Sequence, residues 1–151
     1  MKELTVDSYM EGMNEQKIIA YTDGSALANG KKNSACGWAY KLIWNGIEKI
    51  ASGGTTGETN NRMEMTAVLQ AMRAIKNKNF PTEIYSDSAY LVETMNGKYA
   101  MKKNTDLWDK LITERKKFRD IKFFWVKGHE KDQHNIEVDR AANAEAEKRK
   151  G

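Results

Sequence analysis

The sequence has little of three residue types that constrain structure or chemistry, with one cysteine, one proline and two histidines among 151 residues. Its single cysteine, Cys36, excludes an internal disulfide and, with no second thiol, does not favour a structural zinc site. We therefore expect a packed thiol in a reducing, cytoplasmic compartment. Long hydrophobic runs are also missing, so we expect neither a membrane span nor an export signal.

The sequence also has no large excess of positive or negative charge, because 25 Lys and Arg residues nearly balance 21 Asp and Glu residues. The resulting net charge of +4 and isoelectric point near 9.0 are compatible with an anionic partner but do not indicate one by themselves. The length predicts one domain with its own hydrophobic core. We expect residues 1–15 to form a short polar tail, residues 16–151 to form the single domain, and the protein to be a monomer.

The first sequence patterns along the chain are those of β-strands. The run Ile18–Tyr21 is short, apolar and rich in β-formers, which predicts a buried central strand. Residues 36–44 alternate between apolar and other residues, Asn45-Gly46 is a typical hairpin turn, and residues 47–52 form the returning strand. These segments predict an antiparallel meander of three strands, followed by a loop rich in glycine and threonine.

The second half of the chain alternates between helical and strand patterns. Its expected elements are a helix over 61–76, a strand over 83–86, a helix over 88–95, a helix starting at Thr105 or Asp106, a buried strand over 121–126 and a helix over 136–149. A strand, a helix and a second strand in succession imply a crossover, so the strand over 83–86 should lie parallel to an earlier strand. This order of elements indicates an α/β fold.

Asp23 and Asp87 each follow a predicted strand directly. A carboxylate at the end of a buried strand loses hydration, and a metal ion or a helix N-terminus would offset that loss. Gly24 frees the backbone beside Asp23 to turn away or to let a ligand approach. The alternatives are a turn at Asp23-Gly24 and a helix cap at Asp87.

Glu64 and Asp139 lie on helix faces that otherwise carry apolar or small residues. Asp139 shares its face with Ala142 and Ala146, which are small enough to let the helix lie close to the sheet. A capping box with Asn61 remains an alternative explanation for Glu64, and a solvated helix position remains one for Asp139.

The four carboxylates together fit one shared site better than four separate explanations. Converging carboxylates repel one another and therefore need divalent cations. Because the chain offers no histidine-rich or cysteine ligand set, hard oxygen ligands indicate Mg²⁺ or Mn²⁺. Two such ions, roughly 3.5 to 4 Å apart, can activate a water and stabilise the leaving oxygen in phosphodiester cleavage.

Four motifs in this chain resemble, in order and spacing, those of type 1 ribonuclease H. They are TDGS at 22–25, TNNRMEM at 59–65, YSDSAYLV at 85–92, and WVKGH at 125–129 with Asp139 ten residues after His129. The resemblance covers almost everything from Lys17 onward and implies a five-stranded mixed sheet, three strands antiparallel and two parallel, flanked by helices. It also implies an endonuclease that hydrolyses the RNA strand of RNA/DNA hybrids and leaves 5′-phosphate and 3′-hydroxyl ends.

The same resemblance implies roles for individual residues. Two Mg²⁺ ions, with Mn²⁺ as a substitute, are expected on the carboxylates of Asp23, Glu64, Asp87 and Asp139. His129 matches a loop histidine that assists proton transfer or product release. Three further positions match contacts to the nucleic acid, namely Thr59, Asn60 and Asn61.

One segment departs from the pattern of many relatives. Where they carry a long basic protrusion with tryptophans, this chain has only NGKYAMKKN at 96–104. We expect part of its hybrid binding to come from Lys98, Lys102 and Lys103. Two alternatives remain, a non-catalytic hybrid-binding module of the same fold and an integrase-type or resolvase-type enzyme. The intact carboxylates disfavour the first, and the TNNRMEM and WVKGH motifs disfavour the second.

Overall fold

The computed structural model describes residues 17–28, 31–127 and 132–150. Over these residues the chain forms a five-stranded sheet in the order β3-β2-β1-β4-β5. Its strands are β1 Ile18–Ala26, β2 Ala35–Trp44, β3 Ile47–Thr56, β4 Thr82–Ser86 and β5 Ile121–Trp125. β1, β2 and β3 pair antiparallel, whereas β4 is parallel to both β1 and β5. The predicted α/β fold with a mixed five-stranded sheet is therefore confirmed.

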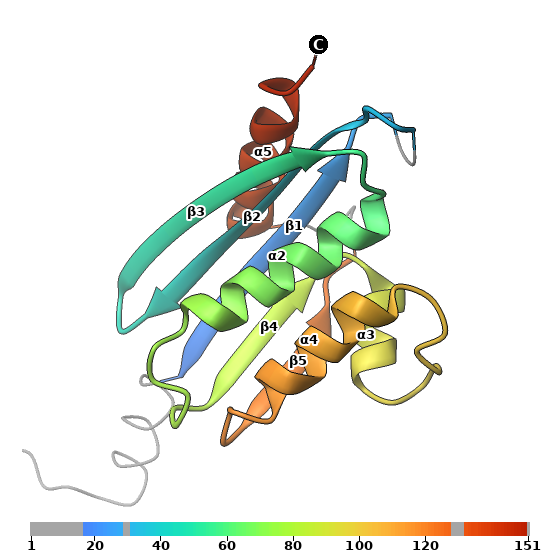
Figure 1. Cartoon of the computed structure of the whole chain (residues 1–151). Helices are drawn as coiled ribbons and strands as arrows, with labels where there is room; N and C mark the ends of the chain where they lie inside the picture. The colour runs from blue at the N-terminus through green and yellow to red at the C-terminus, as the bar shows by residue number, and fades with distance from the viewer. Residues whose placement is uncertain (1–16, 29–30, 128–131, 151) are drawn as a thin grey trace, which may run out of the picture.

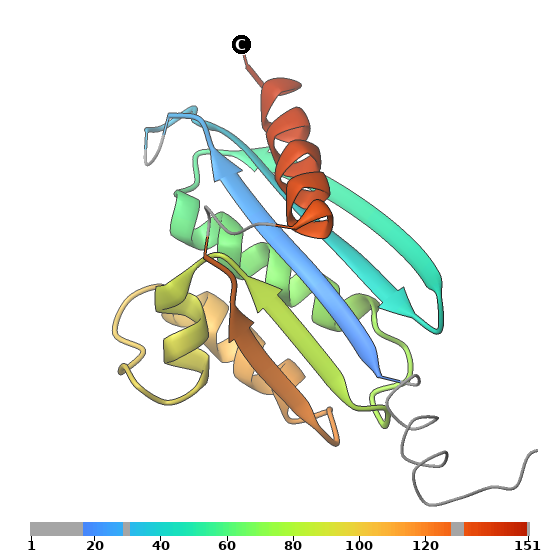
Figure 2. The same ribbon diagram turned by 180° about the vertical axis from the view of Figure 1, so that it is seen from behind.

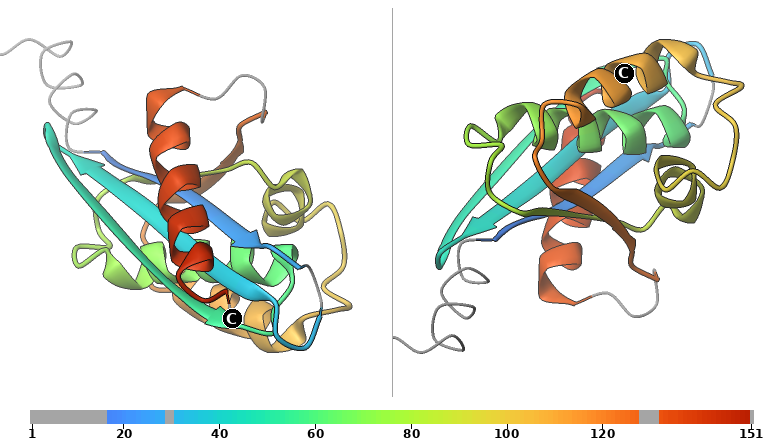
Figure 3. Two further views of the ribbon diagram at one scale, coloured as in Figure 1. Left: turned by 90° about the horizontal axis from the view of Figure 1, so that it is seen from above. Right: turned by 90° about the horizontal axis from the view of Figure 1, so that it is seen from below.

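Helices lie on both faces of this sheet. They are α2 Asn60–Ala74, α3 Ala89–Met95, α4 Thr105–Arg115 and α5 Gln133–Glu147. Figure 1 shows α2 and α4 on one face, and Figure 2 shows α5 on the other, where it crosses β1, β2 and β3. Both views in Figure 3 place the sheet between α2 and α5. None of the described helices has the length and apolar character needed to cross a membrane.

The larger hydrophobic core lies between the sheet and helices α2 and α4. Its most deeply buried large side chains are Trp108, Met65, Met72, Ile84, Leu91 and Leu111. On the other face, α5 lies so close to β2 that a Cβ atom on Gly37 would stand 2.1 Å from the carbonyl oxygen of Ala142. Ala142 and Ala146 are fully buried there, so the expected close approach of this helix to the sheet is confirmed.

A buried lysine fixes α5 to the sheet. Lys41 of β2 is only 4% exposed, donates a hydrogen bond to Glu137 of α5, and forms an ion pair of 3.2 Å with Glu48 of β3. The hydrogen bond to Glu137 is the main cause of a raised pKa for Lys41, so the ammonium group stays charged despite its burial. Because α5 carries Asp139, this anchor also bears on the placement of that carboxylate.

Two strands differ from their expected form. β3 continues to Thr56, because the glycine- and threonine-rich stretch that was expected to form a loop pairs with β2, with Gly54 opposite Gly37. β5 was expected to be buried but is the edge strand, and Phe124 and Trp125 are 37% and 47% exposed. The predicted hairpin turn at Asn45-Gly46 is confirmed, with positive φ angles at both residues.

Candidate active site

Asp23 lies within β1 and does not open a turn. The strand continues to Ala26, and Asp23 pairs with Ala39 of β2. Its side chain is buried, with the residue only 4% exposed, and one carboxylate oxygen accepts a hydrogen bond of 2.9 Å from the main-chain nitrogen of Gly24. The expectation that the strand ends at Asp23, and the alternative of a turn, are therefore wrong.

Gly24 brings β1 and α2 together beside Asp23. A Cβ atom at this position would lie 2.3 Å from the carbonyl carbon of Met63 and 2.4 Å from the main-chain nitrogen of Glu64. Only glycine permits so close an approach without a shift of the helix. The sequence suggested room for a turn or a ligand here, whereas the structure uses the space for the helix that carries Glu64.

Glu64 does not cap its helix. The N-cap of α2 is Thr59, whose side chain accepts a hydrogen bond of 3.2 Å from the main-chain nitrogen of Arg62. The alternative of a capping box between Asn61 and Glu64 is therefore wrong. Glu64 lies one turn further into the helix, and its Oε2 atom is buried without a hydrogen-bond partner among the described residues.

Asp87 follows β4 directly and is likewise not the helix cap. The N-cap of α3 is Ser88, which accepts a hydrogen bond of 3.2 Å from the nitrogen of Leu91. Thr22 of β1 pairs with Ser86 of β4, so Asp23 and Asp87 are the next residues along two adjacent parallel strands. This register brings both carboxylates to the same end of the sheet.

Asp23, Glu64 and Asp87 form one cluster, in which one carboxylate oxygen from each residue lies within 4.8 Å of the others. Burial is the main cause of a pKa of Glu64 well above its usual value, and the negative charges of Asp23 and Asp87 raise it further. Three close carboxylates with a buried oxygen that lacks a partner form an all-oxygen donor set. Such a set fits a hard divalent cation.

The two remaining predicted catalytic residues are Asp139 and His129. Asp139 is half-buried in α5, which packs on β1 and β2, but it is not a member of the carboxylate cluster found among the described residues. His129 lies outside the described residues. The ring of the second histidine, His134, stacks on that of Tyr21 with 4.9 Å between centroids.

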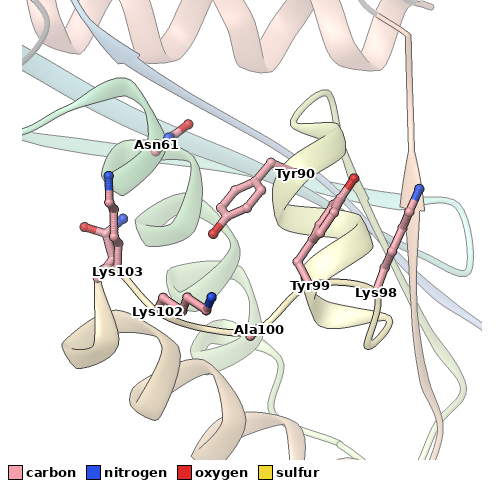
Figure 4. A pocket seen from close by; sticks show the side chains of 8 residues that line it. Asn61, Tyr90, Lys98, Tyr99, Ala100, Lys102 and Lys103 are labelled. Carbon is pink, nitrogen blue, oxygen red and sulfur yellow. The ribbon is translucent and has the colours of Figure 1, made fainter.

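A pocket of about 560 Å³ lies beside the first turn of α2 (Figure 4). Four of its lining residues were predicted from the sequence to bind nucleic acid, namely Asn61, Lys98, Lys102 and Lys103. Thr59 and Asn60 do not line it. Thr59 caps α2, and Asn60 accepts a hydrogen bond of 2.7 Å from the nitrogen of Ala26.

Two tyrosines in this pocket were missed in the sequence. Tyr90 of α3 and Tyr99 of the loop over 96–104 stack with 5.9 Å between ring centroids, and they are 39% and 44% exposed. Figure 4 shows Tyr90 between Asn61 and Tyr99, and the ammonium group of Lys98 lies 5.4 Å from the ring centre of Tyr99. The sequence signal for Tyr99 was an aromatic residue among lysines in NGKYAMKKN, because exposed rings and cations together are typical of nucleic-acid surfaces. That segment does not include Tyr90, which lies in α3.

Comparison with known proteins indicates the family of this chain. The RNase H family model matches residues 15–147. A ribonuclease H from Chromobacterium violaceum is 37% identical to this chain, over 85% of this chain and 94% of its own length. Among solved structures, the N-terminal RNase H domain of a Mycobacterium tuberculosis protein has a TM-score of 0.77 at 21% identity, covering 88% of this chain and 95% of that one. LC11-RNase H1, solved in complex with an RNA/DNA hybrid, has a TM-score of 0.72 at 22% identity, covering 87% and 97%.

The likeness to these two structures supports the fold, and the match of the family model and of the bacterial relative supports the enzyme class predicted from the motifs. The chain belongs to the ribonuclease H family.

Proposed function

We propose that this chain is an endonuclease that hydrolyses the RNA strand of RNA/DNA hybrids with two divalent cations and leaves 5′-phosphate and 3′-hydroxyl ends. The observation that carries the proposal is the convergence of Asp23, Glu64 and Asp87 at one end of the sheet. A relative named ribonuclease H and a similar structure that contains a hybrid support the choice of substrate.

The cations are held by the carboxylates of Asp23, Glu64 and Asp87, with Asp139 of α5 as the fourth ligand. Mg²⁺ is the expected ion, with Mn²⁺ as a substitute, because the donors are all carboxylate oxygens. When bound, two such ions would supply the positive charge that activates an attacking water and stabilises the leaving oxygen of the phosphodiester. His129, which follows β5 in the sequence, assists the proton transfer or the release of product.

The pocket between α2, α3 and the loop over 96–104 binds the hybrid beside the carboxylates. Asn61 is three residues before Glu64 on α2, and Tyr90 is three residues after Asp87, so the pocket lies about one helical turn from the cluster. Its three lysines neutralise backbone phosphates, and such contacts bind without reading the sequence. Selectivity then comes from the 2′-hydroxyl groups of one strand and the shape of the duplex.

The test is an end-labelled cleavage assay on matched RNA/DNA, RNA/RNA and DNA/DNA duplexes, each with Mg²⁺ and with a chelator. It includes Asp87→Asn, which removes one member of the cluster, and Asp109→Asn as a control at an exposed position of α4. The expected result is cleavage of only the RNA strand of the hybrid, dependent on Mg²⁺, lost in Asp87→Asn and unchanged in Asp109→Asn.

Two other outcomes would contradict the proposal in different ways. Binding of the hybrid without any cleavage would favour a non-catalytic binding module of the same fold. Cleavage of the DNA duplex would favour a nuclease or strand-transfer enzyme that shares this sheet.

A further inference from the structure

Arg62 contacts Asn104 in the pocket wall, in an arrangement that neither the sequence nor the proposed chemistry explains. It belongs to the TNNRMEM motif, and its side chain is 24% exposed. Its guanidinium group donates two parallel hydrogen bonds to Asp106 of α4, of 3.0 and 2.8 Å, and one of 2.6 Å to Glu58 before α2. One arginine thus joins the chain before α2, the first turn of α2 and the first turn of α4.

The same guanidinium group reaches the pocket wall through Asn104. The Oδ1 atom of Asn104 accepts a hydrogen bond of 3.2 Å from Nη1 of Arg62. Asn104 lines the pocket, has a positive φ of 57°, and is the N-cap of α4 without a capping hydrogen bond from its own side chain. Its side chain therefore serves the contact with Arg62 instead of the usual cap.

This contact fixes the part of the loop that carries two of the pocket lysines. Lys102 and Lys103 directly precede Asn104, and the main-chain carbonyl of Asn104 accepts hydrogen bonds from Leu107 and Trp108 in the first turn of α4. Trp108 is 1% exposed in the main core, so the first turn of α4, which follows Asn104, is rigid. Through its hydrogen bond to Asn104, Arg62 also holds the end of the loop to α2, the helix that carries Glu64.

We infer that Arg62 is a positioning residue that sets the pocket lysines relative to the catalytic carboxylates and so determines how tightly the hybrid is held. The inference rests on the proposed function for its substrate. Arg62 does not contact the substrate in this scheme and acts through Asn104 and Asp106. The planar guanidinium group of Arg62 is essential, because its two parallel hydrogen bonds to one carboxylate fix an orientation that a lysine ammonium group cannot fix.

The protein contains a matched control for this role. Arg73 also links α2 to α4, through Glu114 at 3.9 Å, but lies eleven residues further along α2. At 1.5 Å per residue that is roughly 16 Å along α2 from Arg62, and Arg73 does not line the pocket. Arg62→Lys and Arg73→Lys therefore make the same chemical change between the same two helices, near the pocket and far from it. Asp106→Asn provides a second variant that weakens the bidentate pair and leaves Arg62 in place.

The experiment has three readouts. Steady-state cleavage of the hybrid gives kcat and KM, binding of the hybrid in an Asp87→Asn background gives Kd, and amide hydrogen exchange reports on residues 98–104. For Arg62→Lys we expect KM and Kd to rise about tenfold with kcat within about twofold, because binding energy away from the reacting bond is removed. Exchange in residues 98–104 should accelerate, and Asp106→Asn should shift all three readouts in the same direction by less. Arg73→Lys should leave them unchanged.

Several results would overturn the inference. A rise of KM in Arg73→Lys equal to that in Arg62→Lys would mean that any weakening of the link between α2 and α4 has this effect. Faster exchange in the loop with unchanged KM and Kd would mean that Arg62 orders the loop without affecting the substrate. If the wild-type protein binds the hybrid without cutting it, the proposed activity fails while the Kd comparison still decides the role of Arg62. If the wild-type protein does not bind the hybrid, both fail.

Discussion

The carboxylate cluster and the neighbouring pocket are built in different ways. Asp23 is 4% exposed within the central strand, and Glu64 is held against it by a helix that approaches at Gly24. The pocket instead takes Lys98, Lys102 and other exposed side chains from a loop beside that helix. The difference teaches that, on the proposed function, catalysis depends on backbone geometry fixed by distant parts of the chain, whereas binding of the hybrid depends on a local segment. A single substitution in the cluster should therefore abolish cleavage, whereas the loss of one pocket lysine should weaken binding only slightly.

The largest effect is expected at the strand positions of the cluster. Asp23→Asn should lower the rate of hybrid cleavage by more than about a thousandfold, because the site loses a charged ligand at the point where charge develops in the reaction. In the absence of metal the melting temperature should stay the same or rise, since one of several repelling carboxylates has been neutralised. Single-turnover cleavage and calorimetry check the two parts. A sharp fall of the metal-free melting temperature would show that the carboxylate is needed for the fold.

A substitution that moves the backbone should have the next largest effect. Gly24→Ala places a methyl group 2.3 Å from the carbonyl carbon of Met63, so α2 must shift away from β1. We expect the free energy of unfolding to fall by about 2 kcal/mol, within the usual range for overpacking. Cleavage should fall further than stability explains, because Glu64 moves with the helix. Urea unfolding and cleavage at a temperature where both proteins are folded measure the two effects.

The control for Gly24→Ala is Gly46→Asn in the hairpin turn. A side chain there meets no atom within 4 Å, and asparagine tolerates the positive φ of this position. Full activity and near-normal stability are expected for the control. If Gly24→Ala also left activity and stability unchanged, the close contact between β1 and α2 would not be what positions Glu64.

The pocket should respond to the loss of several charges rather than one. In a variant with alanine at Lys98, Lys102 and Lys103, we expect KM for the hybrid to rise about 10- to 100-fold with kcat nearly unchanged. The dependence of log KM on log salt should also become shallower by about one unit for each backbone phosphate that a lysine no longer neutralises. A control with alanine at Lys49, Lys148 and Lys150 changes the net charge equally at positions outside the pocket. An equal effect in that control would assign the binding to overall charge.

The elements that the sequence predicted correctly are those whose pattern lies within one short segment of the chain. Local periodicity predicted the five strands, the hairpin and the main helices, because each pattern depends on residues a few positions apart. It did not predict that the glycine-rich stretch after Ser52 continues β3, since that pairing depends on β2. Nor did it show that β5 is an edge strand, because an apolar strand has a similar pattern at the edge and in the centre of a sheet.

In the candidate site, too, residues marked by a local pattern were predicted, and a contact between distant segments was missed. Asp23, Glu64 and Asp87 were singled out because carboxylates are unusual at strand ends and on apolar helix faces, and the structure places these three together. The capping alternatives for Glu64 and Asp87 failed because Thr59 and Ser88 provide the caps. The turn at Asp23 failed because β1 continues to Ala26. The stack of Tyr90 on Tyr99 was missed because it joins α3 to a loop without regular structure, and no periodic pattern indicates such a contact.

The smallest and most specific effect concerns the proton on Glu64 in the metal-free protein. Burial is the main reason why its pKa lies well above the usual 4.5, followed by the charges of Asp23 and Asp87. A carboxyl group whose pKa is higher in the folded than in the unfolded state binds its proton more tightly when folded. This stabilisation is present at low pH and disappears as pH rises from about 4.5 through the folded pKa.

Glu64→Gln stays neutral at every pH and therefore tests this pH dependence directly. In a chelator, the variant and the wild type should melt at nearly the same temperature below pH 4.5, and the variant should be more stable by roughly a few degrees at neutral pH. Carboxylates outside the cluster titrate in the same range, but their effects cancel in the difference between the two proteins. Mg²⁺ should then raise the melting temperature of the wild type more than that of the variant, because a cation takes the place of the proton. A stability gap that is the same at pH 4 and pH 8 would mean that Glu64 is charged in the metal-free cluster and that the three carboxylates tolerate their mutual repulsion without an ion.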